Sequence, residues 1–181
     1  MKYLYVAGLG QEADGEALGR IRERLAAEFP APVRGIELPG VEFAYDPVRR
    51  QYRSIDVLEM LVDACPADAF KLLAVTECDL FIPVLTFVFG QAQLKGKVAV
   101  VSLARLRQEF YGFPENREVF LERLLKEALH ETGHTFGLVH CADGSCAMSL
   151  ATNIRHIDRK RAGFCTSCEG QLRREALGVN L

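Results

Sequence analysis

Three histidines and a glutamate lie close together in the chain with the spacing of a metal site. His130, Glu131 and His134 occur in the stretch HETGH, and the next residues, TFGLVH, end at His140. Residues four apart lie on one face of an α-helix, so the imidazoles of His130 and His134 can bind one ion. Gly137 can adopt the left-handed conformation that ends a helix, which lets His140 reach the same ion. Three imidazoles leave a fourth zinc position open, as in catalytic sites, and Glu131 is close enough to take a proton from water there.

A helix that carries three histidines by chance is the alternative interpretation, because the short HExxH pattern gives false positives. The longer pattern adds a glycine and a third histidine at the correct places, and it uses three of the four histidines in the chain. It therefore favours a metal site. The fourth histidine, His156, lies outside the pattern, and we expect an ordinary surface residue there.

Four cysteines form a second candidate metal site directly after the histidines. They occur as two close pairs, which is typical of a structural zinc site. Two disulfides or unliganded buried thiols are the alternatives, and disulfides are disfavoured in a chain without an export signal. The other two cysteines, Cys65 and Cys78, have no partner spacing, and we expect them in the core. The four candidate ligands are Cys141, Cys146, Cys165 and Cys168.

The two candidate sites are adjacent in the chain, because Cys141 follows His140 directly. A structural ion that fixes Cys141 leaves His140 little freedom. We therefore expect the second metal to stiffen the third ligand of the first.

Composition and charge restrict the classes of protein that the chain can belong to. Apolar residues make up 49% of 181 residues, enough for the core of one soluble domain. The net charge of −2 gives no general attraction to nucleic acid or to an anionic membrane. The apolar run over 1–7 is too short for a signal peptide, and no stretch approaches the roughly 18 apolar residues of a membrane helix. We expect a cytoplasmic monomer without nucleic-acid or membrane partners.

Hydrophobic periodicity predicts strands and helices that alternate before a long helix carries the histidines. This order indicates an α+β fold, with an α/β-like mixed sheet and helices packed against it. Helices are expected over 16–29, 54–65 and 116–136, and strands over 1–7, 33–38, 71–76, 80–84, 86–89 and 97–103.

The combined pattern, HExxHxxGxxH with Met148 and four cysteines after it, resembles the archaemetzincins, a subfamily of the metzincin zinc peptidases. KVAVVSLARLRQEFYG and FLERLLKEALHETGHTFGLVHC are also similar to that family. The resemblance implies one metzincin-type zincin domain over 1–181. It has an upper lobe of sheet and helices over about 1–137, including the active-site helix. A small irregular lower lobe covers about 138–181, with the Met-turn and the four cysteines. Met148 is then the Met-turn residue below the imidazoles, a role compatible with simple core packing.

The expected reaction is hydrolysis of peptide bonds, in which Glu131 is the general base for zinc-activated water. Two zinc ions per chain are expected, one catalytic and one structural. The resemblance implies an aminopeptidase-like preference for short peptides. It also implies a substrate that lies antiparallel to an edge strand, for which we select 89–94; an ordinary surface loop is the alternative there.

Two other functions are compatible with parts of the sequence. One is a zinc-stabilised binding protein in which the metzincin site is latent or inactive. The other is a nucleic-acid-binding zinc module, suggested by CxxC and a nearby basic run but disfavoured by the negative charge and the intact HExxH. We expect the basic run to be solvated surface rather than a site for acidic substrates. It consists of Arg155, Arg159, Lys160 and Arg161.

Overall fold

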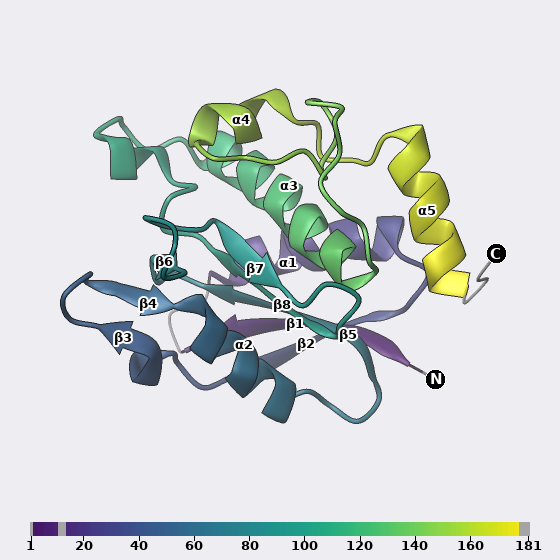
Figure 1. Cartoon of the computed structure of the whole chain (residues 1–181), viewed down its shortest axis with the longest axis horizontal. Coiled ribbons are helices and arrows are strands. Elements are labelled where there is room, and N and C mark those ends of the chain that lie inside the picture. Colours follow the sequence, from purple (N-terminus) through teal and green to yellow (C-terminus); the bar gives the residue numbers. More distant parts are fainter. Residues whose placement is uncertain (1, 11–13, 178–181) are drawn as a thin grey trace.

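A five-stranded mixed sheet, in the order β2-β1-β5-β8-β7, forms the centre of the computed structural model, which describes residues 2–10 and 14–177 (Figure 1). The first four strands are parallel, and β7 runs antiparallel to β8 at one edge. Parallel strands covered on both faces need continuous apolar runs, and β8 (VAVVS) is buried at every position. The strands are β1 (Tyr3–Leu9), β2 (Val33–Leu38), β5 (Ala69–Thr76), β7 (Gly90–Ala92) and β8 (Val98–Ser102).

Helices cover both faces of this sheet because successive strand residues point to opposite sides. Leu73 and Val75 of β5 join a core cluster with α1 and α3, whereas Leu72 and Ala74 join a second cluster with α2. The mixed sheet with helices against it is the arrangement that the sequence predicts. The helices are α1 (Gly15–Glu28), α2 (Ser54–Asp63) and α3 (Arg117–Thr135).

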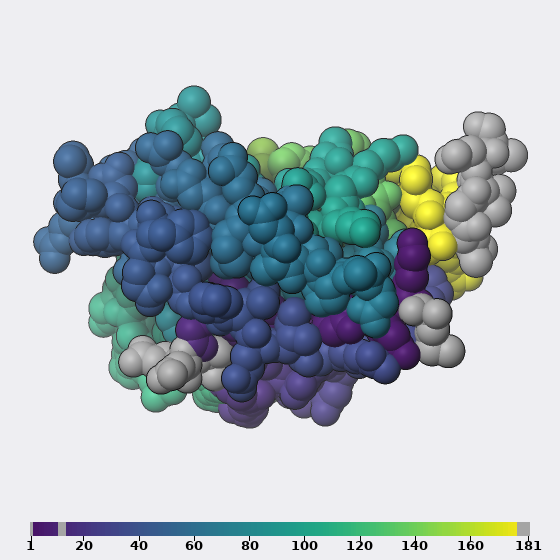
Figure 2. All heavy atoms as spheres, turned by 90° about the horizontal axis from the view of Figure 1, so that it is seen from below, coloured from purple at the N-terminus to yellow at the C-terminus, as the bar shows by residue number. Residues whose placement is uncertain are grey.

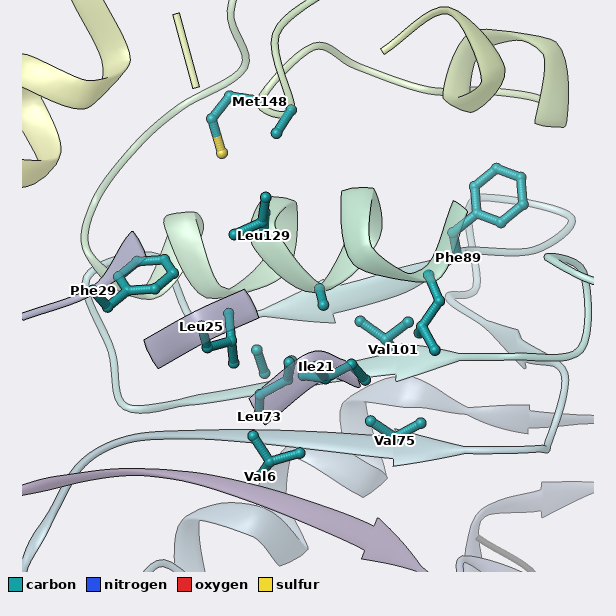
Figure 3. Close-up of a cluster of buried hydrophobic side chains, with 14 of the residues drawn as sticks. Val6, Ile21, Leu25, Phe29, Leu73, Val75, Phe89, Val101, Leu129 and Met148 are labelled. Atoms are coloured by element: carbon teal, nitrogen blue, oxygen red, sulfur yellow. The ribbon is translucent and has the colours of Figure 1, made fainter. Parts of the chain in front are cut away.

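The first cluster encloses α3 from two sides. In Figure 3, Val101 of the sheet and Ile21 of α1 lie below α3, which carries Leu129, and Met148 lies above it. Both Leu129 and Met148 are fully buried. The helix that carries the histidines is therefore held between the sheet and the chain that follows it.

A small three-stranded sheet, β3-β4-β6, lies beside the main sheet. Figure 2 shows that the blue part of the chain, which includes α2, β3 and β4, spreads over the face away from α3. The short elements here and after β8 are η1 (Glu42–Ala44), β3 (Tyr45–Asp46), β4 (Gln51–Arg53), β6 (Leu80–Phe81) and η2 (Gln108–Tyr111).

The chain after α3, over 138–177, is called here the C-terminal segment. It is largely irregular apart from two helices, α4 (Ile154–Arg159) and α5 (Thr166–Leu177), and it packs on the side of α3 away from the sheet (Figure 1). Arg123 of α3 forms two hydrogen bonds with Asp158 of α4, at 2.7 and 2.9 Å. In the part of the chain that the structure describes, no helix is long and apolar enough to cross a membrane.

Most expected elements are present, one expected strand is shorter than predicted, and one is wrong. The three long helices agree with the prediction to within two residues at each end, and β2 agrees at both ends. The strand expected over 80–84 covers only Leu80–Phe81, and residues 86–89 do not form a strand. The edge strand beside β8 is instead β7, at Gly90–Ala92. Pro83 lacks an amide donor, and the exposed side chains of Val84 and Leu85 lie in a turn.

The C-terminal end of α3 has the geometry that stops a helix sharply. The amide of Leu138 donates to the carbonyl of Gly133 at 3.1 Å, and the amide of Gly137 donates to the carbonyl of His134 at 2.9 Å. These two bonds form a Schellman motif. Gly137 has a φ of +89°, which a residue without a side chain adopts readily.

Lys71 of β5 forms a second connection at this end of α3. Its ammonium donates to the carbonyls of Thr135 at 2.6 Å and Gly96 at 2.7 Å, and it lies over the ring of Phe136. Burial lowers the pKa of Lys71 to about 8. The buried ammonium thus joins the last turn of α3 to the β7–β8 hairpin.

Replacing Gly137 with alanine is expected to destabilise the fold. A left-handed conformation costs a residue with a side chain about 1–2 kcal/mol, so Gly137→Ala should lower the free energy of unfolding by about that amount. Urea denaturation measures the change. Gly144→Ala is the control, because nothing lies within 4 Å of a side chain added there. Equal stability of both variants would show that the left-handed turn is not required.

Candidate metal centre and active site

His130 and His134 present one nitrogen each to a common point. Their Nε2 atoms are 3.1 Å apart. The Nδ1 of His130 is 2.8 Å from the carbonyl of Ala147, and the Nδ1 of His134 is 2.7 Å from the carbonyl of Leu138. A carbonyl oxygen can only accept a hydrogen bond, so each Nδ1 carries the proton and each Nε2 has a free lone pair. Both rings are therefore oriented for metal binding by backbone groups beyond the helix.

His140 completes the cluster from the chain beyond Gly137. Its ring centroid is 5.3 Å from that of His130 and 5.1 Å from that of His134, and one nitrogen of each residue lies within 4.8 Å of the others. His130 is buried, His134 is half-buried and His140 is exposed, so the cluster opens on one side. Three converging imidazoles with an open side fit a catalytic zinc ion.

Burial keeps these imidazoles in the form that binds metal. It lowers the pKa of His130 well below its ordinary value, and it also lowers the pKa values of His134 and His140. Only a neutral imidazole has the free lone pair that a metal needs. The surroundings therefore favour the ligand form at neutral pH.

Glu131 lies in a space that Gly90 of β7 leaves free. A side-chain carbon added at Gly90 would lie 2.7 Å from Cγ of Glu131 and 2.8 Å from its Oε1, and also 2.6 Å from the carbonyl oxygen of Val100 in β8. Burial, reinforced by the nearby carboxylate of Glu127, raises the pKa of Glu131 well above the ordinary carboxyl range. A carboxylate with a raised pKa can accept a proton and later return it. The sequence prediction includes Glu131 and misses Gly90, for which a glycine within a strand was the available signal.

A cleft of about 640 Å³ runs along the histidine cluster. One wall is β7 with the preceding turn, and the back is α3. The opposite wall is the chain around His140 and 150–152. Four exposed apolar side chains are part of its lining: Leu85, Leu94, Val139 and Leu150. The segment 89–94 thus contains the edge strand of the sheet, as predicted, and that strand faces the cleft.

Met148 lies against the helix turn between the two ligands. It is fully buried, and a side-chain carbon added at Gly133 would lie 2.6 Å from its sulfur. The glycine inside HETGH therefore makes room for the methionine. The backbone of Met148 also contacts the second site, because its carbonyl accepts from the amide of Cys141 at 3.0 Å.

The structure brings together the four cysteines of the second candidate site. Their four Sγ atoms lie within 4.8 Å of one another, and Sγ of Cys141 is 3.8 Å from Sγ of Cys165. The amide of Cys165 donates to Sγ of Cys146 at 3.3 Å. A hydrogen bond from the backbone of Cys168 lowers the pKa of Cys165 to about 7, which favours a thiolate. All six cysteines are free thiols, and four converging sulfurs fit a structural zinc ion.

The remaining cysteines and the fourth histidine lie elsewhere. Cys65 and Cys78 are half-buried and pack against the cluster beside α2, at the margin of the core rather than inside it. His156 is half-buried near the start of α4, and its Nδ1 accepts from the amide of Thr152 at 3.3 Å. The structure does not place any of these three residues in the two metal clusters.

Lys160 contradicts the prediction of a solvated basic run. Its side chain is fully buried, and its ammonium is 2.9 Å from Oε1 of Glu127. Lys160 comes three residues after the buried Ile157, which places both on the covered side of the chain. The other three residues of the run are exposed, as expected: Arg155, Arg159 and Arg161.

Comparison with known proteins identifies the family of this chain. The model of peptidase family M54 matches residues 34–174. The archaemetzincin of Methanocaldococcus jannaschii is 42% identical over 139 residues, which cover 77% of this chain and 75% of that protein. The archaemetzincin of Methanopyrus kandleri is 43% identical over 133 residues, 74% of this chain and 72% of that protein.

Solved structures agree with both the fold and the family. The crystal structure of the M. kandleri archaemetzincin has a TM-score of 0.83 and 34% identity, over 96% of this chain and 94% of the other. A zinc-dependent peptidase from Methanocorpusculum labreanum also has a TM-score of 0.83, with 35% identity over 93% of this chain and 99% of the other. The predicted α+β fold and the resemblance are confirmed, and the chain belongs to peptidase family M54, the family of the archaemetzincins.

Proposed function

We propose that this metallopeptidase hydrolyses peptide bonds with a zinc ion held by His130, His134 and His140. The observation that carries the proposal is the convergence of three imidazoles beside Glu131 on the wall of an open cleft. When bound, zinc supplies Lewis-acid activation of water and of the scissile carbonyl. A solved relative is named a zinc-dependent peptidase, which supports the choice of metal.

Glu131 moves the proton in this proposal. Its carboxylate takes a proton from the attacking water and gives it to the amine that leaves. The position of Glu131 beside His130 and at the wall of the cleft supports both transfers. The imidazoles keep their Nδ1 protons, which are engaged with backbone carbonyls.

The substrate is proposed to extend along β7. Phe89 and Gln93 form hydrogen bonds with β8, so the alternation of an antiparallel ladder directs the backbone groups of Gly90 and Ala92 to the open edge. A peptide in extended conformation can pair with these groups. The cleft has the size of small-ligand sites, which supports an aminopeptidase-like preference for short peptides.

A second zinc ion is proposed at the four cysteines, with a structural role. A binding protein with a closed histidine site is the rival function, and the exposure of His140 at the cleft supports the enzyme over it. The free thiols support a reducing compartment such as the cytoplasm, and we propose a monomer that acts on peptides.

Changing Glu131 to glutamine tests the catalytic role directly. Glu131→Gln keeps the shape of the side chain and removes the base, so hydrolysis should fall by about 100-fold to 10,000-fold. Zinc bound at the histidine cluster should remain. The measurements are zinc content and cleavage of a peptide library that contains free and N-acetylated members.

Four outcomes separate the alternatives in this experiment. Cleavage of free peptides that Glu131→Gln abolishes supports the proposal, and equal cleavage of acetylated peptides would refute the aminopeptidase-like preference. Full activity of Glu131→Gln would refute the role of the base. Zinc at both clusters in the unchanged protein without cleavage would favour the binding protein.

A side chain at Gly90 is expected to displace Glu131. A misplacement of about 1 Å in a catalytic group can reduce the rate by about 100-fold, so Gly90→Ala should lower kcat/KM by that order while zinc content is unchanged. Gly19→Ala is the control, because nothing lies within 4 Å of a side chain added there. Wild-type kcat/KM in Gly90→Ala would show that Glu131 does not depend on this space.

Loss of the cysteine cluster is expected to weaken the histidine cluster. In a folded Cys165→Ser, Cys168→Ser variant, the affinity for zinc at the histidines should fall by about 10-fold to 100-fold, because the neighbour of His140 is no longer fixed. Competition with a chelator measures this affinity, and Cys65→Ser is the control outside both clusters. Unchanged affinity would refute the coupling of the two sites.

A further inference from the structure

A buried ion pair lies directly behind the first histidine, and the proposed reaction does not use it. The side chains of Lys160 and Glu127 are 0% and 3% exposed, and Nζ of Lys160 is 2.9 Å from Oε1 of Glu127. The same Nζ is 3.5 Å from Nδ1 of His130. Removing two charges from water is unfavourable, and hydrophobic residues often replace such a pair without loss of stability. The position of the pair against a proposed metal ligand therefore points to a role beyond stability.

The backbone next to Lys160 holds the group that orients His130. The amide of Arg161 donates to the carbonyl of Ser145 at 2.8 Å, and the amide of Ala147 donates to the carbonyl of Gly163 at 2.9 Å. Residues 161–163 thus pair with 145–147. The carbonyl of Ala147 is the one that accepts the proton of His130 Nδ1 at 2.8 Å.

These contacts form a closed path that begins and ends on α3. It leaves the helix at Glu127, passes through Lys160 and the paired segments, and returns through the carbonyl of Ala147 to His130, three residues further along the same helix. A path closed over such a short span fixes the carbonyl relative to the ring. Because Nδ1 of His130 already donates to that carbonyl, the ammonium of Lys160 needs the carboxylate of Glu127 as its own partner.

We propose that Lys160 and Glu127 are a positioning pair for His130: they fix the segment that carries Ala147 and so hold the ring with Nε2 toward the metal. The inference rests on the proposed assignment of His130 as a metal ligand. Partners of this kind commonly affect metal affinity about 10-fold to 100-fold without touching the ion.

A second buried cation on α3 provides a matched control. Lys126, the residue before Glu127, has a side chain that is 2% exposed. Its Nζ is 2.9 Å from Oε1 of Glu122. Its ammonium also contacts the backbone of Asp158, so it joins α3 to α4 as Lys160 does. The difference is that Lys126 has no contact with the histidine cluster among its hydrogen bonds and ion pairs.

The test uses Co²⁺ as the probe, in the full chain. Cobalt at the cysteines gives thiolate charge-transfer absorption, whereas cobalt at the histidines gives only the weaker visible bands; His134→Ala identifies the latter by their loss. The test variant is Lys160→Met with Glu127→Gln, which leaves no unpaired buried charge. The control variant is Lys126→Met with Glu122→Gln.

We expect the test variant to bind Co²⁺ at the histidines about 10-fold to 100-fold more weakly, with altered visible bands and intact thiolate absorption. The control should match the unchanged protein. If the test variant does not fold, Glu127→Gln alone keeps an acceptor for the ammonium and should show a smaller loss. Unchanged affinity and bands in the folded variant would overturn the inference. Absence of histidine-bound cobalt in the unchanged protein would instead refute the metal assignment.

Discussion

Because His130 and His134 share one face of α3, an imidazole as near in the chain as His140 can meet them only if the helix stops within a turn of His134. The Schellman motif at Gly137 provides this stop, and the chain reverses toward the cluster at His140. Every other part of the site depends on where that reversal occurs. It places Cys141 at the second cluster, and it leads the chain to Met148, which packs on the side of α3 away from the sheet.

Enclosure of α3 on two sides explains why its sequence is only weakly amphipathic. A surface helix has one buried stripe, whereas α3 packs on the sheet with one side and on the C-terminal segment with the other. The second side buries charged groups that must find partners. Lys126 pairs with Glu122, and Glu127 pairs with Lys160. The catalytic candidate Glu131, one turn after Glu127, has no such partner among its hydrogen bonds and ion pairs. Burial of this carboxyl group raises its pKa well above the ordinary range.

The parts that the sequence predicts well are those that local rules determine. The histidines, Glu131 and the stop at Gly137 follow from helical spacing, and α1, α2 and α3 follow from periodic apolar residues. The strand expected over 80–84 is shortened to Leu80–Phe81 and the strand expected over 86–89 is absent, because apolar residues after Phe81 line the cleft or lie in an exposed turn. The short strand β4 pairs with β6, which lies much further along the chain. The burial of Lys160 depends on Glu127, 33 residues earlier, and local spacing carries no information about such a contact.

The ammonium of Lys71 has a consequence for the width of the cleft. It holds the end of α3 and the β7–β8 hairpin together, and the amide of Lys95 adds a bond to the carbonyl of His134 at 3.0 Å. The edge strand β7 and the helix α3, which carries two of the histidines, are therefore held together as one side of the cleft. The opposite wall of the cleft is the chain around Val139 and Leu150, which follows Gly137. This opposite wall also carries His140, so the width of the cleft and the geometry of the histidine cluster depend on the same segment of chain.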